Sequence, residues 1–267
     1  MTVKVFADPG HGGHDPGATG HGLKEKDVVL KISNYFVDIL NNKYSGVIAK
    51  ASRTTDKYIS LSKRADMAND FGADLFISFH TNAFNGSAYG FESFIYNGNV
   101  GEKTKKAQDY IHEEVMKVND LKDRGQKQAN YAVLRETVMP AVLTENGFID
   151  NKHDAKKLKS DDYLYSIAEA HAKGVAKLFN LKKKSSSKKE SGNNSKKMYE
   201  VIAGTFSYYN NAKTQERRIK KAGFDAYIKK SGKYYQVIAG TFVNYDNAKK
   251  QSKRIEDKGF DTYIKQI

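Results

Sequence analysis

Three β-prone segments of this chain each run directly into a side chain that can take part in catalysis. They are residues 3–7 before Asp8-Pro9-Gly10-His11, residues 73–79 before His80, and residues 141–144 before Glu145. Segments rich in β-branched and aromatic residues favour strands, and an Asp-Pro-Gly sequence favours a turn. In an open α/β sheet, ligands bind beyond the carboxyl ends of the strands. We therefore expect these three side chains to share one site.

The segments between these strands show the periodicity of helices. Apolar residues recur at a spacing near 3.6 in four segments, which predict helices over residues 28–40, 63–71, 103–118 and 163–179. Further strands are predicted over residues 47–52, 90–96 and 131–135. Ser60 or Ser62 can cap the second helix, and Gly72 can end it. Strands that alternate with helices predict an α/β fold with a mostly parallel sheet flanked by helices.

Four polar side chains of this region have a structural interpretation as their default. Arg64 and His112 fall on predicted helices, where a solvated surface is the ordinary interpretation. His153 and His171 lie in polar or helical surroundings without an evident partner. None of the four is therefore assigned a metal or a proton-transfer role.

A polar stretch divides the chain. Residues 182–197 are rich in Lys, Ser and Asn and contain no apolar side chain, so they have nothing to bury. We expect them to form a flexible basic linker between a catalytic domain over residues 1–181 and a second domain over residues 198–267.

The second domain contains an internal repeat. The sequence Val201-Ile202-Ala203-Gly204-Thr205-Phe206 recurs unchanged at residues 237–242. Each unit reads as a strand, a helix capped at Asn210 or Asp246, a glycine and a short strand. One such βαβ unit cannot bury its apolar face alone. Two of them predict a small ferredoxin-like α+β domain, a four-stranded antiparallel sheet with two helices behind it.

The charge of the chain is concentrated in its second half. The net charge is +14, yet residues 1–181 hold 24 basic and 23 acidic side chains and are almost neutral. The basic tail predicts an anionic partner, so the first domain resembles the enzyme and the second its anchor. The chain has no cysteine, which excludes disulfides and thiol nucleophiles.

Its start resembles no signal peptide, and no apolar run is long enough to span a membrane. We therefore expect a protein that is made in the cytoplasm without a signal peptide. If it acts outside, it would be released by lysis or through a pore.

The candidate site residues have the chemistry of a catalytic zinc centre. His11, Glu25 and His80 supply two imidazoles and a carboxylate, a ligand set that leaves a fourth position for water. Glu145 would then be the general base that takes the proton from this water. Arg53, Arg64 and Asn82 lie near strand ends or one helix further on, and they are candidates for binding substrate.

The motifs around these residues resemble those of the type 3 N-acetylmuramoyl-L-alanine amidases. The motifs are Asp8-Pro9-Gly10-His11-Gly12-Gly13, Gly22-Leu23-Lys24-Glu25-Lys26, Ser52-Arg53-Thr54, Ser78-Phe79-His80-Thr81-Asn82 and Glu145-Asn146-Gly147-Phe148-Ile149. The resemblance covers about residues 3–179. It implies a zinc enzyme that cleaves the amide between muramic acid and L-alanine in peptidoglycan, with zinc on His11, Glu25 and His80 and with Glu145 as the catalytic glutamate.

The tandem repeats resemble SPOR-type peptidoglycan-binding units. Together the two parts look like the amidases that lyse the mother cell during sporulation, and like some phage endolysins. The resemblance implies peptidoglycan as substrate and binding partner. We further expect a monomer that binds no nucleic acid and inserts into no membrane.

Two other functions remain open from the residues. A zinc exopeptidase that acts on wall peptides would use the same ligand set, but it would cleave between amino acids. A basic sheet with exposed aromatic residues can also bind RNA without catalysis. The repeats lack the Arg/Lys-Gly-Phe/Tyr signature of such RNA modules, which argues against this second alternative.

Overall fold

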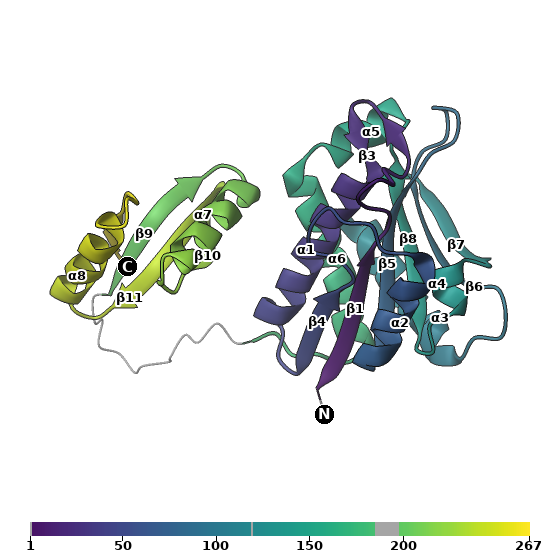
Figure 1. The fold of residues 1–267 in the computed structure, drawn as a ribbon, viewed down its shortest axis with the longest axis horizontal. Coiled ribbons are helices and arrows are strands. Elements are labelled where there is room, and N and C mark those ends of the chain that lie inside the picture. Colours follow the sequence, from purple (N-terminus) through teal and green to yellow (C-terminus); the bar gives the residue numbers. More distant parts are fainter. Residues whose placement is uncertain (1, 119, 185–197) are drawn as a thin grey trace. The chain divides into compact units, whose positions relative to one another are not determined.

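The structure is a computed structural model that describes residues 2–118, 120–184 and 198–267. The chain divides into two compact units, Met1–Ser185 and Ser186–Ile267 (Figure 1). The candidate site residues all belong to the first unit. In the described residues, no helix is long and apolar enough to cross a membrane.

A six-stranded sheet forms the centre of the first unit, in the order β4-β1-β5-β8-β6-β7. Its strands are β1 (Val3–Pro9), β4 (Val47–Ala51), β5 (Leu75–Asn82), β6 (Phe91–Tyr96), β7 (Asp123–Ala129) and β8 (Ala141–Phe148). Neighbouring strands are parallel except for β6 and β8, which are antiparallel. The prediction of a mostly parallel α/β sheet is therefore confirmed. Two short strands, β2 (Thr19–Gly20) and β3 (Leu23–Lys24), pair separately before the first helix.

Helices cover both faces of this sheet (Figure 1). They are α1 (Glu25–Lys43), α2 (Leu61–Phe71), α3 (Glu102–Val118), α4 (Ala132–Arg135), α5 (Lys152–Leu158) and α6 (Asp161–Leu178). Helices α1 and α3 contact the sheet and both pack against α6. Helices α2 and α4 contact each other and enclose an apolar cluster with Phe6, Phe76 and Leu143 of the sheet. Because side chains alternate along a strand, the face that holds these three residues also holds Asp8, His80 and Glu145.

The local signals predicted α2 well. The Ser60 side chain accepts a hydrogen bond from the Lys63 amide at the start of the helix. Gly72 ends the helix with φ of 63°, a conformation that glycine adopts without steric cost. Ser60, rather than Ser62, is therefore the capping residue.

Besides the short elements β2, β3 and α5, which were not predicted, two elements differ from expectation. Residues 131–135 were predicted as a strand, but they begin the short helix α4, in which Val133 and Leu134 are buried. Packing of these two side chains on the sheet overrides their β propensity. The edge strand β7 was not predicted, because its sequence Asp-Arg-Gly-Gln-Lys-Gln-Ala has no apolar alternation.

Two surface assignments are wrong. Arg64 is only 2% exposed and pairs with Asp8, which is also buried. His112 is 5% exposed and contacts the Ser93 hydroxyl and the Asp123 carboxylate. A helical pattern shows which face is apolar, but not that a polar side chain meets a partner on a distant element.

The second unit is a four-stranded antiparallel sheet in the order β10-β11-β9-β12, as predicted. Its elements are β9 (Tyr199–Phe206), α7 (Tyr209–Lys221), β10 (Tyr227–Ser231), β11 (Tyr234–Phe242), α8 (Tyr245–Glu256) and β12 (Tyr263–Gln266). The core contains the same residues of both repeats, including Val201 with Val237 and Ala212 with Ala248. Both helices begin two residues earlier than predicted. The side chain of Asn244 caps α8, and Tyr208 occupies the cap position of α7 without a side-chain hydrogen bond.

The start of the predicted linker is hydrogen-bonded to the first unit. The Ser45 amide donates to the Lys182 carbonyl at 2.9 Å, and the Lys184 amide donates to the Lys43 carbonyl at 2.8 Å. Residues 182–184 therefore extend the first unit beyond the predicted boundary at 181. The remaining linker residues, 185–197, lie outside the described part of the chain.

Candidate metal centre

His11 reaches the site from the loop that follows β1. It has φ of 58°, and Gly12 and Gly13 after it also have positive φ. A left-handed residue turns the chain sharply, which glycine neighbours allow. The His11 Nδ1 atom lies 2.8 Å from an Asp15 carboxylate oxygen, so the Nε2 atom faces Glu25 at 3.1 Å.

Glu25 is the first residue of α1, and its side chain is almost completely buried. Its carboxylate accepts hydrogen bonds from the amides of Ala18 at 2.8 Å and Thr81 at 3.0 Å. Burial alone would raise the pKa of Glu25. The hydrogen bonds from His11 and His80, together with their charges, outweigh burial and hold the pKa of Glu25 well below its usual range. Glu25 is thus an anion between two imidazoles.

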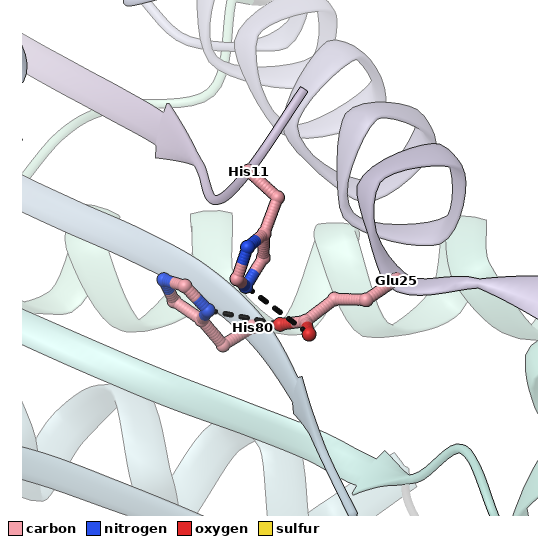
Figure 2. A group of neighbouring side chains, drawn as sticks. All are labelled: His11, Glu25 and His80. Carbon is pink, nitrogen blue, oxygen red and sulfur yellow. Dashed lines mark hydrogen bonds and ion pairs between the residues drawn. The ribbon is translucent and has the colours of Figure 1, made fainter. Parts of the chain in front are cut away.

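His80 completes the group from β5. Its Nδ1 atom lies 2.9 Å from the second carboxylate oxygen of Glu25. A dashed line marks this contact in Figure 2. Burial disfavours the charged imidazole, but the hydrogen bond to Glu25 and its charge raise the pKa of His80 to about 9. The rings of His11 and His80 meet edge to face, with centroids 5.1 Å apart. The structure therefore brings together three residues that the sequence assigned to one metal site.

The donor atoms of His11, Glu25 and His80 all lie within 4.8 Å of one another, so they could hold one metal ion. Two glycines make this approach possible. A Cβ atom on Gly10 would lie 2.2 Å from His80 Cε1, and one on Gly17 would lie 2.6 Å from Glu25 Oε2. The imidazoles share their protons with an anionic carboxylate, and a divalent cation can take the place of those protons. The residues present thus fit a metal ion with nitrogen and oxygen ligands.

Asp15 is a site residue that the sequence did not single out. Its carboxylate accepts from His11 Nδ1, and it also accepts from the Gly17 amide at 3.0 Å. A carboxylate on the far nitrogen fixes the ring and the tautomer of a ligating histidine. Its position four residues after His11, in a glycine-rich turn, was the available signal.

Glu145 lies opposite His80 in the register of β5 and β8. The two side chains therefore leave the sheet on the same face. One oxygen of the Glu145 carboxylate is buried and, in the described structure, has no hydrogen-bond partner. Burial raises the pKa of Glu145 to about 7; the charges of Glu25 and Glu92 act in the same direction, whereas His80 opposes them. A carboxyl group with such a pKa can accept and release a proton near neutral pH.

A cleft of about 270 Å³ opens at this place. Its lining comes from the loop after β1, from α2 and the loop before it, from β5 and from α4, and it includes His11, Asp15, Tyr58, His80 and Val133. A substrate segment in this cleft would contact both imidazoles. The centre is therefore buried on the protein side and open on the side of the cleft.

Arg53 and Arg64 lie beside the site, and Arg64 also lines the cleft, but both make most of their contacts with the chain itself. Arg53 is 1% exposed and donates to the carbonyls of Pro9 and Gly10 at 3.1 and 2.7 Å. Arg64 donates to the carbonyls of Pro9 and His11 at 2.6 and 2.7 Å and pairs with Asp8 at 2.8 Å. Both guanidinium groups thus hold the loop that carries His11.

Asn82, the third predicted substrate-binding residue, lies on β5 beside Glu92. Its amide nitrogen donates to the Glu92 carboxylate at 2.7 Å. Glu92 also pairs with Arg124 and Lys127 of β7. The sequence did not reveal this group, since its members follow no regular spacing and β7 itself was not predicted.

A second hydrogen-bonded group resembles a catalytic triad. Its members are Ser93, His112 and Asp123, with the histidine between the other two. The distances are 2.9 Å from Ser93 Oγ to His112 Nδ1 and 2.9 Å from His112 Nε2 to Asp123. Ser93 is completely buried, so no substrate can reach its hydroxyl. This group is structural.

Comparison with known proteins identifies the families of both units. Residues 5–177 match the family described as N-acetylmuramoyl-L-alanine amidase, and residues 195–266 match the SPOR domain. Over 226 residues the chain is 46% identical to a sporulation-specific N-acetylmuramoyl-L-alanine amidase of Bacillus subtilis (strain 168), covering 85% of this chain and 84% of that protein. It is also 46% identical to an endolysin of Bacillus phage SPP1 over 188 residues, 68% of each chain.

The fold of the first unit matches solved amidase structures. A crystal structure of an N-acetylmuramoyl-L-alanine amidase from Clostridium difficile 630 aligns with a TM-score of 0.65 and 32% sequence identity. The alignment covers 67% of this chain and 97% of that one. The α/β fold predicted from the sequence and the amidase resemblance are thus both confirmed.

Proposed function

Because this chain belongs to the N-acetylmuramoyl-L-alanine amidase family, we propose that it hydrolyses the bond between N-acetylmuramic acid and L-alanine with zinc held by His11, Glu25 and His80. Glu145 is the general base of this reaction. The observation that supports the proposal is the convergence of three donor side chains within 4.8 Å, with Glu145 opposite His80 on the neighbouring strand.

Zinc bound at these residues would supply a Lewis acid at the mouth of the cleft. Glu145 accepts a proton from the water that attacks the amide carbonyl, and it returns this proton to the departing nitrogen of L-alanine. The bond between carbonyl carbon and nitrogen breaks, leaving a carboxylate on the muramic acid and a free amine on the peptide. The partly buried Glu145, with a pKa of about 7, suits both proton transfers.

Other residues position the reacting groups. Asp15 holds the ring of His11, and Arg53 and Arg64 hold the backbone of the loop on which His11 lies. Since these arginines donate to backbone carbonyls, and Arg64 also to the Asp8 carboxylate, we assign them a positioning role rather than contact with substrate. Asn82 borders a neighbouring cleft and stays a candidate for substrate contact.

The second unit anchors the enzyme to its insoluble substrate. The SPOR match and the amidase match both point to peptidoglycan as the partner. Residues 198–267 hold 14 basic and seven acidic side chains, which suits an anionic wall. Monomeric action, the absence of nucleic-acid binding and release by lysis or through a pore stay predictions.

The test combines metal analysis with product analysis. We expect about one zinc per chain, loss of activity in chelator and its return with added zinc. Glu145→Gln keeps zinc but loses activity by ~10²–10⁴-fold, because only the proton acceptor is removed. His11→Ala loses zinc as well. Glu169→Gln, on a carboxylate that pairs with Lys43 at the surface, is the matched control with normal activity.

Mass spectrometry of digested wall fragments identifies the bond that is cut. The proposal requires a free α-amino group on L-alanine with the glycan intact. An uncleaved muramyl–alanine bond beside cleaved peptide bonds would instead support the exopeptidase alternative. A Glu145→Gln variant with a normal rate would remove the assigned base.

A further inference from the structure

We propose that Arg124 and Lys127, both held by Glu92, form a subsite that binds a carboxylate on the peptide part of the substrate. This inference rests on the proposed amidase function and adds to it the chemical class of the peptide that is accepted. The subsite lies on the other side of Glu145 from the metal centre.

The register of three neighbouring strands places Glu145 between the metal centre and Glu92. His80 of β5 lies opposite Glu145 of β8, and Glu145 lies opposite Glu92 of β6. All three side chains leave the same face of the sheet. Because neighbouring strands are about 4.8 Å apart, Glu92 lies roughly 10 Å from His80 across the sheet. A substrate that crosses the strands from the metal passes Glu145 and then reaches Glu92.

Glu92 contacts more cations than its single negative charge needs. Its side chain is 4% exposed and accepts from Arg124 Nε at 2.8 Å and from Lys127 Nζ at 2.5 Å. Asn82 adds a neutral hydrogen bond at 2.7 Å. One cation would balance the carboxylate, so the group keeps a surplus of one positive charge. The side chains of Arg124 and Lys127 are 28% and 38% exposed, so a ligand can reach them.

Arg124 still has donors to offer. Its Nε atom is used on Glu92, and its guanidinium lies 4.8 Å from the centre of the Phe148 ring. Within the described residues, its two terminal nitrogens have no hydrogen-bond acceptor. Arg124 lines a cleft of about 290 Å³ together with Asn82, Phe84 and Phe148. A guanidinium fixed by a carboxylate and an aromatic ring is preorganised to bind a second carboxylate through its free edge.

The backbone around Arg124 is shaped for this position. A Cβ atom on Gly90 would lie 2.3 Å from the Lys122 carbonyl oxygen and 3.0 Å from Arg124 Cγ, and Gly90 has φ of 117°. Gly90 therefore lets both the backbone before β7 and the arginine stem approach the start of β6. An extended peptide advances about 3.3 Å per residue, so the roughly 10 Å between His80 and Glu92 corresponds to two or three peptide residues. The carboxylate recognised by Arg124 belongs to that part of the peptide.

The experiment compares two soluble muramyl peptides whose second residue has either a free α-carboxylate (D-glutamate) or the corresponding amide. We expect the wild-type chain to prefer the free acid by about tenfold or more in kcat/KM, mainly through KM. Arg124→Gln and Lys127→Met should lower kcat/KM for the acid toward the value for the amide. Arg124→Lys should keep more of the preference than Arg124→Gln, because lysine keeps the positive charge but lacks the paired N–H donors of the guanidinium group.

The matched control is Lys43→Met. Lys43 is also a half-exposed cation paired with a carboxylate, but it ends α1, whereas Glu25 begins this helix of 19 residues. It should keep the preference of the wild type. Equal rates on acid and amide in the wild type would overturn the subsite, and so would an equal loss on both substrates in Arg124→Gln.

A binding measurement separates this inference from the proposed function. Binding of L-alanyl-D-glutamate and of its amide to the full chain, followed by NMR, needs no turnover. If the acidic peptide binds through Arg124 but neither muramyl peptide is cleaved, the subsite stands and the amidase assignment fails. If both are cleaved equally and neither peptide binding nor rate depends on Arg124, the amidase stands and the subsite fails.

Discussion

At the scale of single residues, Gly10 and Gly17 provide the space in which the side chains of the proposed metal centre meet. Each lies where a Cβ atom would overlap a ligand side chain, His80 for Gly10 and both His11 and Glu25 for Gly17. The ligands are therefore positioned partly by the absence of side chains around them. A substitution that changes no ligand can still displace one.

This space yields a first prediction. Gly10→Ala should displace the His80 ring, because the added methyl group would lie 2.2 Å from Cε1 and the neighbouring backbone cannot withdraw easily. We expect at least ~10-fold weaker zinc binding, measured by competition with a chelator, and a comparable loss of rate. Gly101→Ala has open space around the same atom and should behave as wild type. Unchanged zinc affinity in Gly10→Ala would contradict the packing described.

His171 yields a prediction for stability. It is completely buried, its Nδ1 donates to the Ile167 carbonyl at 2.8 Å, and its Nε2 accepts from the Thr144 hydroxyl at 3.1 Å. Burial lowers the pKa of His171 to about 4, and the nearby His112 acts in the same direction. Above pH 6.5 the imidazole is neutral in both states. As the pH falls from 6.5 toward 4, the unfolded chain gains a proton that the folded chain excludes, so stability is lost.

The size of this loss can be measured. At pH 5 it is about 2 kcal/mol, since each pH unit below 6.5 costs ~1.4 kcal/mol. Urea unfolding at pH 7.5 and pH 5 should therefore differ by this amount more in the wild type than in His171→Gln, which has no proton to gain. Identical pH dependence in the two proteins would show that the buried imidazole does not resist protonation.

At the scale of elements, the parallel strands were the most predictable part of the molecule. Their β-branched and aromatic runs predicted β1, β5 and β8, and with them the meeting of His11, His80 and Glu145. The edge strand β7 could not be predicted, because an edge strand is often polar and shows no buried face. The partners of Glu92 were missed for the same reason, since two of them lie on β7.

The roles of Arg53 and Arg64 could not be predicted from the sequence either, for a different reason. Their contacts with residues 8–11 join positions that are 43 to 56 residues apart, such as Arg53 with Gly10 and Arg64 with Asp8. Composition and periodicity describe one element at a time. The pairing of a buried guanidinium with a loop on another element appears only when the chain has folded.

At the scale of elements, we predict how the ion pair between Arg64 and Asp8 contributes to stability. Arg64→Met leaves Asp8 buried with only the Ser52 and Ser78 hydroxyls as partners. We expect a loss of about 3–5 kcal/mol in urea unfolding, because the remaining charge is uncompensated. Adding Asp8→Asn should recover part of the stability, since the orphaned charge is removed. A double variant that is less stable than the sum of both single changes would contradict the direct pairing.

At the scale of the whole molecule, the chain divides its chemistry and its attachment between two units. The first unit holds all the proposed catalytic residues, and most of the basic surplus lies beyond it. Electrostatic attraction between a basic domain and an anionic polymer weakens with salt, whereas an active site that is shaped by packing does not. Activity on soluble fragments and attachment to walls should therefore be separable.

Truncation is the direct test of this separation. A chain that ends at Lys184 should stay folded and should cleave soluble muramyl peptides at the wild-type rate, because every group of the site is retained. It should lose most binding to purified walls, measured by co-sedimentation at low and high salt. Residues 198–267 alone should bind walls without cleaving them. Equal wall binding by the full and truncated chains would reject the anchor role.

The exact end point of the truncation is itself informative. A chain that ends at Leu181 loses the strand-like contacts of residues 182–184, including the hydrogen bond from the Lys184 amide to the Lys43 carbonyl and that from Ser45 to the Lys182 carbonyl. Each such bond contributes about 1 kcal/mol, so the shorter chain should unfold at a measurably lower temperature. Activity should remain the same in both, since these contacts lie at the end of α1, away from Glu25. Equal melting temperatures would place the boundary of the folded unit at residue 181, because residues 182–184 would then contribute no measurable stability to the first unit.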